Sequence, residues 1–309
     1  MSNTASQTTS NILMVRPASF GFNDQTADSN GFQQRTELPE VAQQALKEFD
    51  GFVRLLRSHG VNVTVVNDTA EPHKPDAIFP NNWVSFHSNG DVIIYPMQAQ
   101  NRRWERNEAA IRGLEGQFKV DHIIDLSRFE LEEKFLEGTG SMVLDRENRI
   151  AYACLSPRTH ADVLNGFCNY MDYEPMTFHS LDSKGKAIYH TNVMMCLGSR
   201  YAVICLESIA DEKERQQVIE SLQKTGKEII DITYEQMDHF AGNMLEIQNN
   251  AGKSLLVMSA SAKASLTDEQ LNTLQTYSEI VSPDIRTIET IGGGSARCMI
   301  AEIHLPLIK

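Results

Sequence analysis

The sequence has no apolar run near the roughly 20 residues that cross a bilayer. Residues 1–10 are polar and lack the basic and apolar regions of a secretory signal peptide. We therefore expect a cytoplasmic protein that does not bind membranes. Basic residues are also few, since 28 Lys and Arg against 41 Asp and Glu give a formal net charge of −13. This charge repels phosphate backbones, so we do not expect nucleic acid as a partner.

The chain also lacks the cysteine and histidine patterns typical of metal sites. Its five cysteines are an odd number and include no CxxC pair, and its nine histidines include no i, i+4 pair. We therefore expect no metal site. Four cysteines lie in apolar stretches, where a free cysteine usually fills the core, namely Cys154, Cys168, Cys196 and Cys205.

The composition is that of a folded protein, because 41% of the 309 residues are hydrophobic and 22% are charged. Short β-branched or aromatic runs recur, often as two strands in tandem followed by a helical stretch. Strands are expected at 12–15, 61–66, 83–87, 92–95, 141–144, 150–154, 191–197, 201–206, 244–248, 254–258 and 298–304. Helices are expected at 39–58, 102–114, 159–171, 211–224 and 267–276, and hairpin turns at 88–91, 145–148 and 249–252.

A unit of two strands and a helix, repeated about five times, predicts a pseudo-symmetric α/β protein rather than a Rossmann sheet. No segment resembles an interdomain linker, and the first ten residues look disordered. We expect a disordered segment at 1–10 and one domain at 11–309.

The fifth cysteine has a different setting, because a glycine-rich loop at 292–294 leads through Ser295, Ala296 and Arg297 to Cys298. Glycines allow crowded backbone conformations, so the thiol can project into a cavity. A cysteine nucleophile also needs a group that takes up its proton or holds it as thiolate. A cysteine beside a turn is more often core filler, so other residues must decide between the two interpretations.

Three more segments place polar residues among apolar ones. Asn82 lies within 78–83, Glu137 within 135–141, and His190 and Asn192 within 189–195. In a pseudo-symmetric repeat, the ends of equivalent strands converge on the central axis. If His190 begins a strand, Asn192 points to the same face, and a carboxylate at Glu137 is suited to orient His190. Each residue alone is more often structural: a satisfied histidine, a solvated acid or a turn asparagine.

In this order, with Cys298 last, the segments resemble the pentein or amidinotransferase superfamily, which includes arginine deiminases and dimethylarginine hydrolases. Phe79 to Asn82 is similar to its F-x-x-D element, Leu136 to Gly140 to its L-E-G-G-D element, and His190 to Asn192 to its H-x-D element. Gly293 to Cys298 resembles its cysteine loop, and Arg102 and Arg158 lie in segments similar to those whose arginines contact a substrate carboxylate. The resemblance begins near Ile12 and is closest to bacterial citrulline-utilisation hydrolases.

The resemblance implies a five-bladed α/β propeller of ββαβ modules that works without a metal or an organic cofactor. It implies that Cys298 attacks the planar carbon of a guanidino or ureido group. His190 would protonate the leaving nitrogen and later activate water, while Glu137 orients His190. The partner would be a small amino-acid substrate. The oligomeric state stays open, with a homodimer as one option.

The chain departs from the family at three aspartates, which are replaced by Asn82, Gly140 and Asn192. A buried guanidinium without opposing carboxylates is costly, whereas an amide offers a donor and an acceptor to a neutral head group. We therefore predict a cysteine-dependent hydrolase that cleaves the ureido C–N bond of citrulline or a relative. The same residues also suit a two-step hydrolase that takes a guanidine through a ureido intermediate.

Other functions stay open. The first is a deiminase or dihydrolase of arginine or a substituted arginine, and the second is an amidinotransferase, although nothing marks a pocket for a second amine. A non-catalytic pentein binding module and an amino-acid sensor belong to another class. Against that class stands the joint presence of Glu137, His190 and Cys298.

Overall fold

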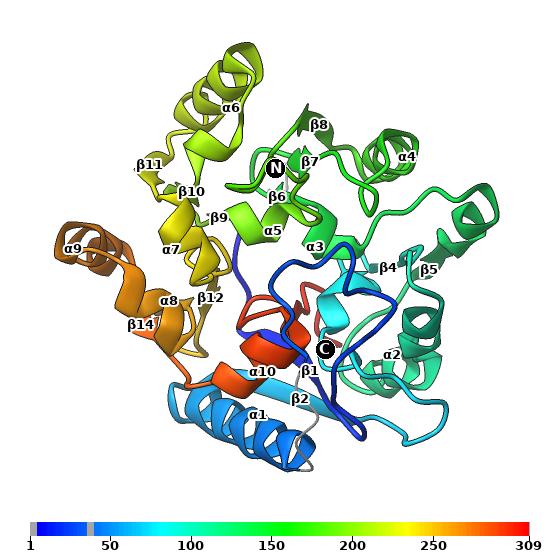
Figure 1. Cartoon of the computed structure of the whole chain (residues 1–309). Coiled ribbons are helices and arrows are strands. Elements are labelled where there is room, and N and C mark those ends of the chain that lie inside the picture. The colour runs from blue at the N-terminus through cyan, green and yellow to red at the C-terminus, as the bar shows by residue number, and fades with distance from the viewer. Residues whose placement is uncertain (1–4, 36–39, 309) are drawn as a thin grey trace.

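The computed structural model describes residues 5–35 and 40–308, which form five three-stranded sheets around a central axis (Figure 1). Four sheets follow chain order. They consist of β3 (Val84–Phe86), β4 (Asp91–Ile94) and β5 (His122–Asp125); β6 (Val143–Asp145), β7 (Ile150–Cys154) and β8 (Glu174–Phe178); β9 (Met195–Leu197), β10 (Tyr201–Ile204) and β11 (Glu228–Asp231); and β12 (Leu245–Gln248), β13 (Ser254–Val257) and β14 (Glu279–Val281). The expected five-bladed α/β propeller is confirmed.

The fifth sheet joins the two ends of the chain. Its strands are β15 (Ala301–Glu302), β1 (Asn11–Arg16) and β2 (Asn62–Asn67), with Ile12 opposite Glu302 in an antiparallel pair. As in the other sheets, the central strand pairs antiparallel on one side and parallel on the other. The ring is therefore closed by hydrogen bonds between its first and last strands.

Each parallel pair of strands is joined through a helix, because parallel strands need a crossover connection. These helices lie at the rim in Figure 1, and they are α1 (Val41–Ser58), α2 (Glu108–Leu114), α4 (Ala161–Met171), α6 (Glu212–Lys224) and the pair α8 (Ala260–Ser265) and α9 (Asp268–Tyr277). Helix α1 buries Ala45, Phe49, Phe52 and Leu56, which share one face at helical spacing. In the part of the chain that the structure describes, no helix is both long and apolar enough to cross a membrane.

Shorter helical turns lie closer to the axis. They are η1 (Pro80–Asn82), α3 (Gly138–Ser141), α5 (Thr191–Met194), α7 (Tyr234–Asp238) and α10 (Arg286–Gly292), with η2 (Gln100–Glu105), η3 (Ser127–Glu132) and η4 (Leu206–Ser208) elsewhere. Buried apolar side chains form separate clusters, one of which packs Leu13 of β1 against Val84 of β3 and Val92 of β4. Hydrophobic packing therefore holds neighbouring blades together, while the turns near the axis carry buried polar groups.

The structure corrects three expected elements. Residues 191–197 are not one strand, because 191–194 form the turn α5, in which Thr191 Oγ1 donates to the Ser141 carbonyl and accepts from the Cys154 amide. Of 298–304 only two residues are a strand, and the helix expected at 102–114 is split into η2 and α2. The third strand of each chain-order sheet, β5, β8, β11 and β14, was not expected, since these short edge strands are partly exposed and have no clear alternation.

The segment predicted to be disordered, 1–10, is described in part: residues 1–4 lie outside the described residues, and residues 5–10 contact two blades. Buried Gln7 donates through Nε2 to the Leu144 carbonyl (2.9 Å), and its Oε1 accepts from the Arg146 amide (2.8 Å). Thr9 donates to the Ile303 carbonyl (2.8 Å). The segment therefore connects the β6 hairpin to the C-terminal strand.

Gln7→Ala should destabilise the fold, because it leaves a buried carbonyl and a buried amide without partners. We expect a loss of about 2 kcal/mol in the free energy of unfolding, measured by urea denaturation. Ser6→Ala is the control, since the Ser6 hydroxyl is exposed and bonds only locally. Equal urea midpoints for the two variants would show that residues 5–10 contribute nothing to stability.

Candidate active site

The structure brings the predicted site residues together from four blades. Asn82, Gly140, Asn192 and Cys298 each lie two or three residues before the first strand of a blade, β3, β6, β9 or β15. His190 and Glu137 are the N-cap residues that directly precede α5 and α3. The turn before the first strand of each of these blades therefore carries at least one polar side chain to the axis.

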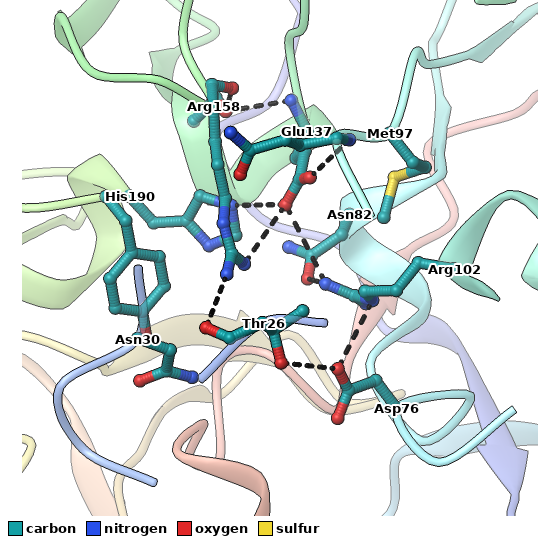
Figure 2. Close-up of polar contacts among 12 residues, drawn as sticks. Thr26, Asn30, Asp76, Asn82, Met97, Arg102, Glu137, Arg158 and His190 are labelled. Atoms are coloured by element: carbon teal, nitrogen blue, oxygen red, sulfur yellow. Dashed lines mark hydrogen bonds and ion pairs between the residues drawn. The ribbon is translucent and has the colours of Figure 1, made fainter. Parts of the chain in front are cut away.

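His190 and Glu137 form a buried pair, with Glu137 Oε2 2.8 Å from His190 Nε2 (Figure 2). Burial lowers the pKa of His190 to about 4, although the Glu137 carboxylate partly offsets this effect. The imidazole is therefore neutral near pH 7. An ionised carboxylate only accepts hydrogen bonds, so Nε2 carries the proton and Nδ1 remains an acceptor on the side of Gly140.

Glu137 stays ionised in spite of its complete burial. Burial raises its pKa, but Arg158 (3.5 Å), His190 and Arg102 (3.7 Å) together hold it well below the usual range. Its other oxygen accepts from the Gln98 amide at 2.9 Å. The carboxylate thus has a partner on every side and is rigidly placed.

Arg102 is fully engaged by protein groups. Two of its nitrogens each lie 2.9 Å from a Glu105 oxygen, and Nη1 donates to Asn82 Oδ1 at 3.0 Å. Burial lowers its pKa, but Glu105, Asp76 and Glu137 raise it more, so it remains a cation. In this structure Arg102 orients Asn82, and its contact with a substrate carboxylate stays a prediction.

Arg158 faces the segment that follows β1. Its guanidinium donates to the Thr26 carbonyl and to Ser29 Oγ, and it lies 4.9 Å from the centre of the Tyr189 ring. Figure 2 shows Thr26 next to the guanidinium, with Asn30 of the same segment farther from it, and Figure 1 shows this segment crossing in front of the centre of the ring. Arg158 therefore links the pair of His190 and Glu137 to a covering loop.

Two buried amides offer unused hydrogen-bonding groups. Because Asn82 Oδ1 accepts from Arg102, its Nδ2 is the free end, and this donor has no partner among the described residues. Asn192 donates through Nδ2 to Cys298 Sγ (3.5 Å), and its Oδ1 has no partner in the same described set. Buried polar groups are normally satisfied, so an orphan donor and an orphan acceptor mark positions for a polar ligand.

The side chains around Gly140 leave no room for a larger residue at this position. A Cβ at this position would lie 2.4 Å from Asn82 Nδ2 and 2.9 Å from His190 Nδ1. No side chain fits without moving one of them. A carboxylate side chain at position 140 is therefore excluded by packing, and the amide of Asn82 and the imidazole of His190 border this position.

Hydrogen bonds hold the loop that carries Cys298 in place. Gly293 adopts a left-handed conformation (φ 62°), and Asn30 donates to its carbonyl. Ser295 accepts the Cys298 amide at 3.0 Å and donates to buried Glu289 at 2.6 Å. These contacts place a buried thiol at the axis.

Sequence reasoning missed Asp76 and Asn243. Asp76 is buried, accepts from Asn23 at 2.7 Å, lies 3.6 Å from Arg102, and keeps Oδ1 without a partner among the described residues. Burial raises its pKa against the effect of Arg102. Asn243 donates to Cys298 Sγ at 3.2 Å. The available signal for Asp76 was its position just before the Phe79 motif. The signal for Asn243 was its position before the first strand of the fourth repeat.

A metal ligand set is not formed by His, Cys, Asp or Glu side chains anywhere in residues 5–35 and 40–308. The site instead combines a thiol, a neutral imidazole, an ionised carboxylate and amide groups. This set can carry out nucleophilic attack, proton transfer and recognition of a planar head group.

A sequence profile of the family described as N,N dimethylarginine dimethylhydrolase, eukaryotic, matches residues 16–305. The comparison with curated proteins gives no match.

Solved structures show the same fold at low identity. The N-terminal domain of ArgZ, an arginine dihydrolase from the ornithine-ammonia cycle in cyanobacteria, is 16% identical, with a TM-score of 0.74 over 96% of this chain and 99% of that chain. Unliganded AgrE is 18% identical, with a TM-score of 0.76 over 97% of this chain and 40% of that chain. A dimethylarginine dimethylaminohydrolase in an adduct with S-methyl-L-thiocitrulline is 15% identical, with a TM-score of 0.63 over 95% and 99%. This chain spans about two fifths of full-length ArgZ and AgrE.

The buried histidines predict a loss of stability in acid. The pKa of His190 and that of His304 are both lowered by burial from 6.5 to about 4, so below pH 6.5 the unfolded chain binds protons that the folded chain does not. Each histidine should therefore remove about 3 kcal/mol of stability as the pH falls from 6.5 to 4. Urea midpoints at pH 7.5 and 5 test this slope.

His304→Gln should make the slope shallower, because it removes one of the buried histidines whose pKa is lowered, a group that also includes His87. An unchanged slope in the folded variant would contradict the assignment of His304 as buried and neutral.

Proposed function

Because the chain belongs to the N,N-dimethylarginine dimethylhydrolase family of the pentein superfamily, we propose that it is a cysteine-dependent dihydrolase of arginine or a substituted arginine. The observation that carries this proposal is the buried orphan amide pair, Asn82 Nδ2 and Asn192 Oδ1, beside the thiol of Cys298. The arginine dihydrolase and dimethylarginine hydrolase among the structural relatives support a guanidine as the starting substrate. They do not support citrulline as the sole substrate.

The first half-reaction cleaves the guanidino group. The thiol proton passes to Nδ1 of His190, Sγ forms a bond to the guanidino carbon, and the π electrons move onto nitrogen. The imidazolium then protonates the terminal nitrogen, and the C–N bond breaks to leave ammonia and a thiouronium on Cys298. Water attacks this carbon as His190 takes its proton, and cleavage of the C–S bond releases a ureido product and restores the thiol.

The second half-reaction uses the same groups on the ureido carbon. Sγ adds to the carbonyl carbon, and the oxygen that gains charge accepts from Asn82 Nδ2, while Asn192 Oδ1 accepts from a ureido N–H. Loss of ammonia gives a carbamoyl thioester, and water converts it to a carbamate, which releases carbon dioxide. Arginine and two waters thus give ornithine, two ammonia molecules and carbon dioxide.

The other end of the substrate has its own partners. Asp76 Oδ1 is a free carboxylate oxygen for an α-ammonium group. Arg158 can take an α-carboxylate by exchanging its contacts with Ser29 and Thr26, since a guanidinium fork matches a carboxylate. We assign Arg158 the anchoring role and Arg102 the positioning of Asn82.

Hydrolysis of citrulline alone is the second candidate. It is favoured by the amides at 82 and 192 and by Gly140, which leave the head-group site without carboxylates of its own. A neutral ureido group enters such a site at a lower desolvation cost than a guanidinium. The two candidates share the second half-reaction and differ only in the first.

The deciding experiment measures ammonia, citrulline and ornithine released from arginine, dimethylarginine, succinylarginine, agmatine and citrulline. The dihydrolase should release two ammonia molecules per ornithine from arginine, or per succinylornithine from succinylarginine, and Cys298→Ser should abolish turnover. Citrulline accumulation would indicate a deiminase, and activity on citrulline alone would establish the second candidate. Calorimetric binding without any product would replace the enzyme with a binding module.

Asn82→Asp should uncouple the two half-reactions. The variant has no donor for the ureido oxygen but gains a countercharge for the guanidinium, so citrulline should accumulate from arginine and the citrulline step should slow by about a hundredfold. Asn82→Ala is the matched control, because it removes the donor without adding charge. Equal product ratios in wild type and Asn82→Asp would refute the role of the amide.

A further inference from the structure

Asn243 occupies in the fourth blade the place that the site residues occupy in the others. It lies two residues before β12, as Asn82 lies two residues before β3, and its side chain is buried. The mechanism above uses side chains from the other blades and none from this one. The fold therefore also brings to the axis a side chain from the remaining blade, and the reaction steps leave it unassigned.

Both ends of the Asn243 amide are fixed by the backbone. Nδ2 donates to the Asn192 carbonyl at 2.8 Å, and Oδ1 accepts from the Arg297 amide at 3.2 Å. The protonated thiol of Cys298 also donates to Oδ1, over a longer distance of 3.6 Å, and this contact is lost when the thiol ionises. An amide oxygen cannot donate and an amide nitrogen does not accept, so the two backbone contacts define which end is which. The second N–H of Nδ2 is thereby directed at Cys298 Sγ, 3.2 Å away.

The geometry points to Asn243 as a further catalytic residue, whose fixed N–H stabilises the Cys298 thiolate and holds Sγ in position for attack. A hydrogen bond to the charged form of a group favours that form, and a donor that is already oriented need not reorganise during the reaction. The catalytic role rests on the proposed function. The effect on the thiol does not, and it can be measured without any substrate.

Amide groups are the neighbours of Cys298 that are placed to stabilise its thiolate. The groups that interact electrostatically with the thiol are Tyr189, whose hydroxyl donates to the Gly293 carbonyl, and Arg297, whose guanidinium is paired with Glu302 at 2.9 Å. Among the described residues, the donors to Sγ are Asn243 and the longer contact from Asn192. The remaining titratable groups of the site are the neutral His190 and the charged or ionisable Glu137, Asp76, Arg102 and Arg158.

The test is the pH dependence of Cys298 alkylation by iodoacetamide, followed by mass spectrometry of the Cys298 peptide. Asn243→Ala should raise the midpoint by about one pH unit and slow alkylation about tenfold at pH 7. Asn243→Asp should raise it further, because it keeps the acceptor for the Arg297 amide but places a carboxylate beside the sulfur. Asn250→Ala, at an exposed position, is the control and should match wild type.

An unchanged midpoint in the folded variants would overturn the proposal even if turnover fell, since lost turnover alone fits a structural role. If Asn243→Ala does not fold, the isosteric Asn243→Asp decides, and failure of both to fold would make the residue structural and refute the proposal. A raised midpoint would support the effect of Asn243 on the thiol even if the wild-type protein turned over none of the panel substrates. The absence of turnover would refute the proposed function, but not the effect of Asn243 on the thiol.

Discussion

The ionised carboxylate of Glu137 is the group on which the rest of the site depends. It is fully buried, and a buried charge is tolerated only where partners surround it. Its partners are His190, Arg102, Arg158 and the Gln98 amide. Each contact also has a second effect, because the carboxylate fixes the tautomer of His190 and holds in place the arginine that orients Asn82. Removing this one charge would take the ion-pair partner from buried Arg158 and would leave Arg102 with Glu105 and Asp76.

Through Arg158, the Glu137 carboxylate is also connected to the segment that covers the site. Arg158 reaches from Glu137 to Ser29 and Thr26 in the segment that crosses the axis in Figure 1. The same segment reaches the nucleophile loop, where Asn30 donates to the Gly293 carbonyl. A ligand that takes over Arg158 must therefore exchange contacts with this segment. Under the proposed function, binding of the amino-acid end and organisation of the nucleophile loop would be coupled through short polar contacts.

The five-part repeat could be predicted from the sequence because each hairpin consists of two buried apolar strands around a clear turn, as in Ile150–Cys154. The edge strands could not, since strands such as Glu174–Phe178 are half exposed and held by parallel pairing with a distant partner.

The turn at 191–194 was predicted as a strand because a buried helical turn and a buried strand give the same apolar run over four residues. The convergence of His190, Glu137 and Cys298 followed from the resemblance. The saturation of Arg102 depends on Glu105, three residues away, and also on Asp76 and Glu137, which are distant in sequence.

The amides of the site differ in how firmly each is held, and this difference suits a reaction with two head groups. Asn82 is oriented by Arg102, and Asn243 by two backbone groups. Asn192 has only one long side-chain contact, 3.5 Å to Sγ, and a free oxygen. An amide held by a single weak contact can turn at little cost, whereas rigid ones preserve their polarity. In the proposed reaction, the rigid donor of Asn82 meets the oxygen that appears after the first step. The Asn192 amide can turn when the guanidino group loses an N–H in the first step.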